Sequence, residues 1–218
     1  MDEPLLQSLP IAHRLALSYA PASAKADTLA LLALDARLTG IVRGDGEAII
    51  AQMKLAWWRE RLSGDPEDWP LGEPLLALFK AWGGDTKRLV PLVDGWETLL
   101  GDTLDRAAVT SFSRGKAQAW SALGDGLGTG STSSAIERAA KEITLFDLVR
   151  NLSRPEEVVV ASNMADKESW ERARLPRALR PLAVLHALSR RAWIGDKSHL
   201  LDGAGAMALA IRVGITGR

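Results

Sequence analysis

The chain has 218 residues, a formal net charge of zero and no cysteine. The balanced charge argues against a nucleic-acid-binding protein. The absence of cysteine excludes disulfides, thiolate metal sites and cysteine nucleophiles, and the three histidines are too widely spaced to predict a zinc site.

The first segment, MDEPLLQSLP, is acidic and contains prolines, which is not typical of a signal peptide. No apolar run reaches the roughly 18 residues that a membrane-spanning helix needs. We therefore expect a cytoplasmic protein, whose contact with the inner membrane is at most peripheral.

Leucine, alanine and helix-boundary residues recur along the whole chain, whereas strand-like alternation is scarce. The expected helices span about 21–44, 47–63, 74–83, 86–100, 104–123, 134–152, 177–193 and 204–212. The glycine-rich segment 124–134 is predicted to be flexible, and Ser134-x-x-Glu137 after it is a capping-box pattern. The β-branched cluster Val158–Val160 is too short to support a sheet. We expect one all-α domain, a helical bundle over residues 1–218.

The expected helix 47–63 contains the adjacent pair Trp57 and Trp58, which cannot share one helix face. Its apolar residues form two stripes, and these are Ile49, Ile50, Met53, Ala56 and Trp57 on one side, and Ala51, Leu55, Trp58 and Leu62 on the other. A surface helix has one apolar face. The pattern therefore predicts a helix packed between others, in which both tryptophans are structural.

The expected helix 21–44 also has two apolar stripes, and Asp35 and Thr39 lie between them at a spacing of four residues. Such a spacing places both side chains on one side of the helix. The pair either faces a central cavity or is solvated.

Three segments resemble the squalene/phytoene synthase family. The first is Pro21–Leu62, where a proline-led helix and a turn precede the W-W-R-[DE] signature at Trp57–Glu60. The second is Ala140–Asn151, which is similar to a later helix with an L-R-D core. The third is Ala173–Trp193, which is similar to the C-terminal P-x-x-x-R-P-L segment. The resemblance implies a bundle of the isoprenoid (terpenoid) synthase type, with helices around a cavity for prenyl chains.

The resemblance also implies a reaction for active members, which join two prenyl diphosphates head to head. Aspartate-rich motifs on facing helices hold Mg²⁺, which neutralises the diphosphate as it leaves. This chain departs from both motifs. The first aspartates would fall near Thr39, Gly40 and Arg43, and the second motif reads Arg150-Asn151 where the family has Arg-Asp. The tyrosine of the family's middle helix is missing too, because Tyr19 is the single tyrosine.

These departures predict a catalytically silent relative that needs no cofactor and holds no metal. Branches without the aspartate motifs include proteins that assemble respiratory complex I. We therefore expect an isoprenoid- or lipid-binding protein, or an assembly factor or scaffold. The alternative is an active Mg²⁺-dependent prenyl-diphosphate transferase.

The sequence predicts no catalytic residue, and it predicts a set of cavity residues that bind a ligand. These are Asp35, Thr39, Gln52, Arg59, Asp147, Arg150 and Asn151. If Gln52 and Arg59 face the cavity, they could hold a phosphate or lipid headgroup without metal, with Arg150 on the facing helix. The alternative for Arg59 is a structural ion pair of the Arg59–Asp147 kind.

The C-terminal third contains a basic region beside several leucines. Its members are Arg172, Arg174, Arg177, Arg180, Arg190 and Arg191. The region predicts contact with a protein partner or an acidic membrane surface, and the alternative is a solvated helix face.

Overall fold

A computed structural model describes residues 3–44, 46–101 and 103–218, and this part of the chain forms eleven α-helices with short 3₁₀ turns and no strand. The helices are α1 (Glu3–Ser8), α2 (Ile11–Ser18), α3 (Ala22–Val42), α4 (Ala48–Ser63), α5 (Pro74–Phe79), α6 (Val90–Glu97), α7 (Arg106–Gly126), α8 (Ser133–Asn151), α9 (Pro155–Ala165), α10 (Arg180–Ile194) and α11 (Ala204–Thr216). The all-α prediction is confirmed. None of the described helices combines the length and apolar composition needed to cross a membrane.

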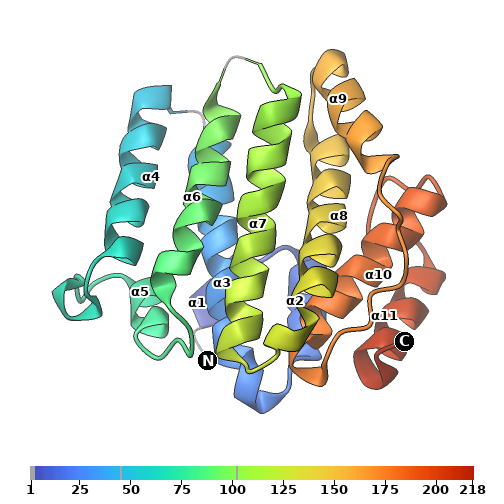
Figure 1. Cartoon of the computed structure of the whole chain (residues 1–218), viewed down its shortest axis with the longest axis horizontal. Helices are drawn as coiled ribbons and strands as arrows, with labels where there is room; N and C mark the ends of the chain where they lie inside the picture. Colours follow the sequence, from blue (N-terminus) through green and yellow to red (C-terminus); the bar gives the residue numbers. More distant parts are fainter. Residues whose placement is uncertain (1–2, 45, 102) are drawn as a thin grey trace.

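Helix α7 is central to the bundle, because it packs between α6 and α8 and also contacts α3 (Figure 1). Glycines allow this close packing. A Cβ added at Gly115 of α7 would lie 2.2 Å from the carbonyl oxygen of Pro91, and one added at Gly95 of α6 would lie 3.1 Å from Cα of Phe112. Helices α4 and α11 lie on opposite sides of the molecule (Figure 1).

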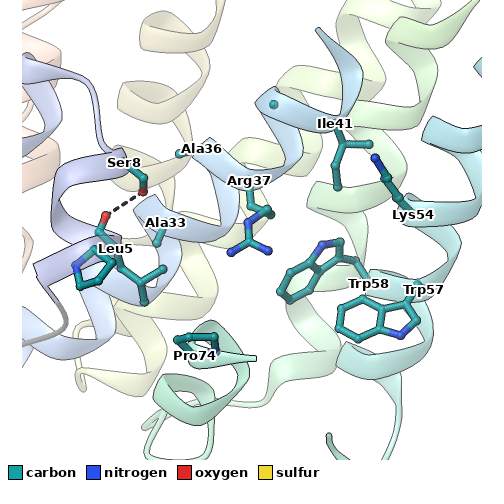
Figure 2. Close-up of a pocket in the computed structure, with 12 residues that line it drawn as sticks. Leu5, Ser8, Ala33, Ala36, Arg37, Ile41, Lys54, Trp57, Trp58 and Pro74 are labelled. Atoms are coloured by element: carbon teal, nitrogen blue, oxygen red, sulfur yellow. Dashed lines mark hydrogen bonds between the residues drawn. The ribbon is translucent and has the colours of Figure 1, made fainter. Parts of the chain in front are cut away.

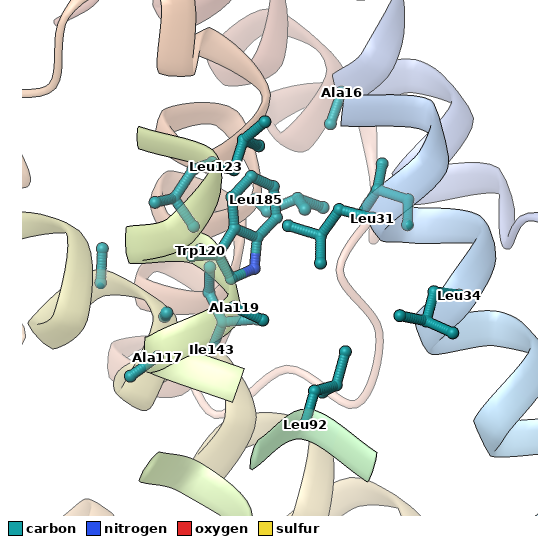
Figure 3. Packing of buried hydrophobic residues seen from close by; sticks show 14 of the residues in the cluster. Ala16, Leu31, Leu34, Leu92, Ala117, Ala119, Trp120, Leu123, Ile143 and Leu185 are labelled. Carbon is teal, nitrogen blue, oxygen red and sulfur yellow. The ribbon is translucent and has the colours of Figure 1, made fainter. Parts of the chain in front are cut away.

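The buried side chains form one hydrophobic cluster to which nearly all of the helices contribute. Figure 3 shows its centre, where Leu31 and Leu34 of α3 face Leu92 of α6 and Trp120 of α7. Burial of such side chains contributes roughly 1.5–3 kcal/mol each from the apolar area removed from water.

Three helices were not predicted, namely α1, α2 and α9. Helix α9 contains the cluster Val158–Val160, and it begins with Pro155 and two glutamates in its first turn, which all favour a helix start. The predicted capping box is wrong, because the N-cap of α8 is Thr132, which makes no side-chain capping bond, and Glu137 instead accepts a hydrogen bond of 3.1 Å from the Ser133 hydroxyl within the helix. The segment predicted to be flexible belongs partly to α7 and partly to a 3₁₀ turn.

The prediction that α4 packs on two sides is wrong. The stripe with Trp58 is buried against the bundle. The other stripe faces outward, and Ile49, Ile50 and Met53 are 55%, 44% and 63% exposed. Helix α4 lies at the edge of the bundle (Figure 1), so only one of its faces has a helix to pack against.

The two tryptophans of α4 provide a matched pair for a stability test. Trp58 is 2% exposed, whereas Trp57 is half-buried and meets Trp58 edge-on with ring centroids 5.0 Å apart. We expect Trp58→Ala to lower the free energy of unfolding by about 3–5 kcal/mol, because it leaves a cavity in the core. Trp57→Ala should cost less than half as much. Urea denaturation measures both, and equal losses would contradict this packing.

Candidate functional site

A cavity of about 470 Å³ lies between α2, α3, α6, α7 and α8. Its apolar lining residues come from all of these helices and from the adjoining turns, and they include Ala12, Val42, Trp96, Leu99, Phe112, Leu148, Leu152 and Leu200. Its polar lining residues are His13, Asp35, Thr39, Arg43, Lys116, Asp147 and Asn151. The volume is within the range typical of small-molecule sites, and so is the combination of an apolar wall with a few polar groups.

Asp35 of α3 is the most strongly tied polar group of the cavity. Its Oδ1 accepts a hydrogen bond of 2.9 Å from the Trp96 indole, and its Oδ2 pairs with the Lys116 ammonium at 2.5 Å. The Lys116 Nζ also lies 5.3 Å from the centroid of the Trp96 ring and 5.5 Å from that of Phe112. The carboxylate thereby joins α3, α6 and α7, and the ion pair neutralises two charges that are both largely buried.

Two ionisable groups that line the cavity, His13 of α2 and Asp147 of α8, form no ion pair among the described residues. Burial lowers the pKa of His13 to about 4, an effect that Asp35 opposes and Lys116 reinforces. Its buried Nδ1 has no hydrogen-bond partner among the described residues. Burial raises the pKa of Asp147 to about 6, while Lys116 lowers it, Asp35 raises it and Arg43 lowers it. At neutral pH His13 is therefore uncharged and Asp147 is mostly ionised.

Arg43, the residue that follows α3, contacts α8 among the residues that line the cavity. The Arg43 guanidinium donates a hydrogen bond of 3.3 Å to the side-chain oxygen of Asn151, whose amide donates to the Asp147 carbonyl. The Thr39 hydroxyl donates to the Asp35 carbonyl one helical turn before it. The hydroxyl hydrogen of Thr39 is therefore already used within the helix, and Thr39 contributes to the cavity mainly as a small wall residue.

The structure brings four of the predicted site residues together in this cavity, namely Asp35, Thr39, Asp147 and Asn151. Their role in ligand binding stays a prediction.

The other three predicted site residues lie elsewhere. Gln52 is exposed on the outer side of α4, because that helix packs on one face alone. Arg59 forms the predicted structural ion pair, but with Asp94 and Glu97 of α6 rather than with Asp147. Arg150 lies outside the cavity, where it pairs with Asp196 at 3.2 Å and stacks over Phe146.

Sequence reasoning missed His13, Trp96 and Lys116. Lys116 carries a detectable signal, because it interrupts a buried face of α7 that includes Phe112, Gly115 and Ala119. A lysine in such a place needs a partner carboxylate. His13 and Trp96 carry no comparable signal, because the fold of α2 and the docking of α6 on α3 place them.

A second, more open groove of about 690 Å³ lies between α1, α3, α4 and the start of α5 (Figure 2). Trp57, Trp58 and Ile41 form its apolar wall, and Arg37 and Lys54 are its charged residues. Arg37 is bonded to Glu73 at 3.0 Å and lies over the Trp58 ring. The cavity around Asp35 contains two ionisable groups whose pKa values are altered by burial, His13 and Asp147, so it is the stronger candidate site.

The cavity residues do not fit the pair of Mg²⁺ ions that an active prenyl synthase uses. Both oxygens of Asp35 already have partners, and Asp147 is the other carboxylate among the described lining residues. Among the residues that the structure describes, no group of three or more His, Asp or Glu side chains is arranged to hold a metal. Mg²⁺ prefers six oxygen ligands, with carboxylates and substrate phosphates among them.

Comparisons with protein-family models, with characterised proteins and with solved structures found no match to this chain. The resemblance to squalene/phytoene synthases therefore stays a prediction, and the cavity is interpreted from its own residues.

The ion pair inside the cavity can be tested by a double-mutant cycle. We expect Asp35→Leu to lower the free energy of unfolding by about 3 kcal/mol, because it leaves the Lys116 ammonium and the Trp96 indole without their acceptor. Adding Lys116→Met should recover at least about 1 kcal/mol, because it removes the unpaired charge. Urea denaturation of the four proteins measures the coupling, and strictly additive losses would contradict the pairing.

The raised pKa of Asp147 predicts a pH-dependent effect on stability. Because its folded-state pKa is above the ordinary value of 3.8, ionisation of Asp147 destabilises the folded state as pH rises from about 4 to about 6. Asp147→Asn should therefore stabilise the protein by about 1–3 kcal/mol at pH 8, and by less at pH 5. Chemical denaturation at both pH values measures this, and Asp68→Asn on an exposed turn is the control. An equal effect at both pH values would contradict the assignment.

Proposed function

We propose that the protein binds a small amphipathic molecule with a lipid-like chain, of which an isoprenoid alcohol is the best-fitting class, in the cavity around Asp35 and Lys116. One observation carries the proposal, namely that an apolar wall and a compact polar cluster share one cavity of about 470 Å³. A prenyl chain would pack against Trp96, Phe112 and Leu148.

The charges of the cavity favour a neutral head over a diphosphate. Lys116 is already neutralised by Asp35, and Arg43 is bonded to Asn151 and lies close enough to Asp147 to lower its pKa. A diphosphate would bring several negative charges to a site whose cations already have partners. The Asp147 carboxylate can instead accept a hydrogen bond from a hydroxyl group.

The proposal includes a catalytically silent role, in which the bound lipid serves transport, sensing or assembly of a larger complex. The lack of fit to Mg²⁺ supports this role over the alternative of a prenyl-diphosphate transferase. With farnesyl or geranylgeranyl diphosphate and Mg²⁺, we expect no release of pyrophosphate. Turnover at ordinary enzyme rates of about 1 s⁻¹ or more would contradict the silent role.

The cavity can be tested by filling it. Thr39→Phe places a ring in the cavity, and we expect it to weaken the binding of farnesol by at least about ten-fold, as measured by titration calorimetry. Thr110→Phe is the matched control, because Thr110 makes the same hydrogen bond to a carbonyl one turn earlier but is exposed on α7.

Two results would overturn the proposal. One is that the unaltered protein binds no farnesol and yields no lipid in mass spectra of its organic extract. The other is that farnesol binds to Thr39→Phe as tightly as to Thr110→Phe, which would place the lipid elsewhere, for example in the groove at Trp57.

A further inference from the structure

Helix α11 has an unusual outer face. Its inner face is buried against the bundle through small residues, namely Ala206, Ala210, Val213 and Gly214. Met207, Ile211 and Ile215 follow at intervals of four residues, and they are 43%, 45% and 70% exposed. A surface helix normally places charged residues on its outer side, but Arg212 is the one charged residue of α11.

Beside this apolar stripe lies a basic groove between α10 and α11, with a volume of about 530 Å³. Arg190, Arg191 and Arg212 line it, together with the exposed Ile194. Arg172 and Arg218 line a small adjoining pocket that shares these three arginines. The sequence predicted the basic region as far as Arg191, but it did not predict that these arginines would lie beside α11.

The arginines of the groove lack acidic partners. Among the described residues, Arg190, Arg191 and Arg212 form no ion pair with a carboxylate, and Arg190 donates instead to the Trp170 carbonyl. The Nη1 of Arg191 is buried without a hydrogen-bond partner, and its Nη2 lies against Gly205, where an added Cβ would be 3.2 Å away. Guanidinium groups without carboxylate partners form strong, charge-assisted hydrogen bonds with phosphate oxygens.

We propose that this face docks on an anionic phospholipid surface, with a lipid phosphate in the groove at Arg190, Arg191 and Arg212 and the stripe Met207, Ile211 and Ile215 inserted among the acyl chains. Charge complementarity favours a bilayer surface as the partner of this face. The arginines would contact the lipid phosphates, and the apolar stripe beside them would contact the hydrocarbon below. Ala208 and Arg212 line the groove and directly follow Met207 and Ile211 of the stripe in the sequence of α11. The stripe and the groove therefore adjoin, and one bilayer surface can contact the stripe and the groove together. The inference does not depend on the ligand of the central cavity.

The test is co-sedimentation with vesicles, either of phosphatidylcholine alone or of equimolar phosphatidylcholine and phosphatidylglycerol. We expect binding to the anionic vesicles, weakened by salt, and at least ten-fold weaker binding to the neutral ones. Arg191→Gln with Arg212→Gln should lower the partition coefficient about thirty-fold, because each arginine near an anionic surface is worth about 1 kcal/mol. Ile211→Asp should lower it at least ten-fold.

Met53→Asp is the matched control, because Met53 is an exposed apolar residue of α4 on the opposite side of the molecule. It should bind vesicles as the unaltered protein does. Circular dichroism verifies that each variant is folded.

Three results would overturn the proposal. The first is equal loss of vesicle binding in Met53→Asp and Ile211→Asp. The second is binding of inorganic phosphate at the arginines without binding to anionic vesicles, which would make the groove a site for a free anion. The third is a lipid-free dimer that Ile211→Asp dissociates, because a second copy of the chain would then cover the stripe.

Discussion

The contact between Asp35, Trp96 and Lys116 constrains the centre of this bundle. It connects three helices through one carboxylate, and it places two charges and an indole N–H where apolar side chains would otherwise meet. A well-packed apolar core at this point would be about as stable or more stable. The presence of a polar cluster with His13 and Asp147 nearby therefore favours a role in binding over a role in folding.

The rest of the architecture follows from how the helices surround this cluster. Close contact of α6 with α7 through Gly95 and Gly115 brings Trp96, Phe112 and Lys116 to one wall. Helix α8 adds Asp147 to the lining of the cavity, and α2 adds His13. Helices α4 and α11 lie farther out, and each leaves an apolar stripe exposed. They differ in charge, because the arginines beside the stripe of α11 form no ion pair within the described part of the chain, whereas Arg59 and Arg61 of α4 are paired with glutamates.

Periodicity and punctuation in the sequence predict the all-α class and most of the long helices, because those signals are local. They do not show which apolar face has a neighbour, and so the prediction for α4 is wrong at Ile49 and Met53. The spacing of Asp35 and Thr39 identifies a pair that does line a cavity. The partners of Asp35 come from residues 61 and 81 positions away. Only tertiary packing brings such residues together, which is also why Arg59 is bonded to Asp94 instead of Asp147.

The central claim is that the cavity around Asp35 and Lys116, and not the groove at Trp57, holds a lipid-like ligand. Hydrogen–deuterium exchange with and without farnesol tests it most directly, because it locates binding along the backbone. We predict slower exchange where α3, α7 and α8 line the cavity, near Thr39, Lys116 and Asn151, with no change in α4. Slower exchange confined to α1 and α4, or none in any segment, would contradict the account.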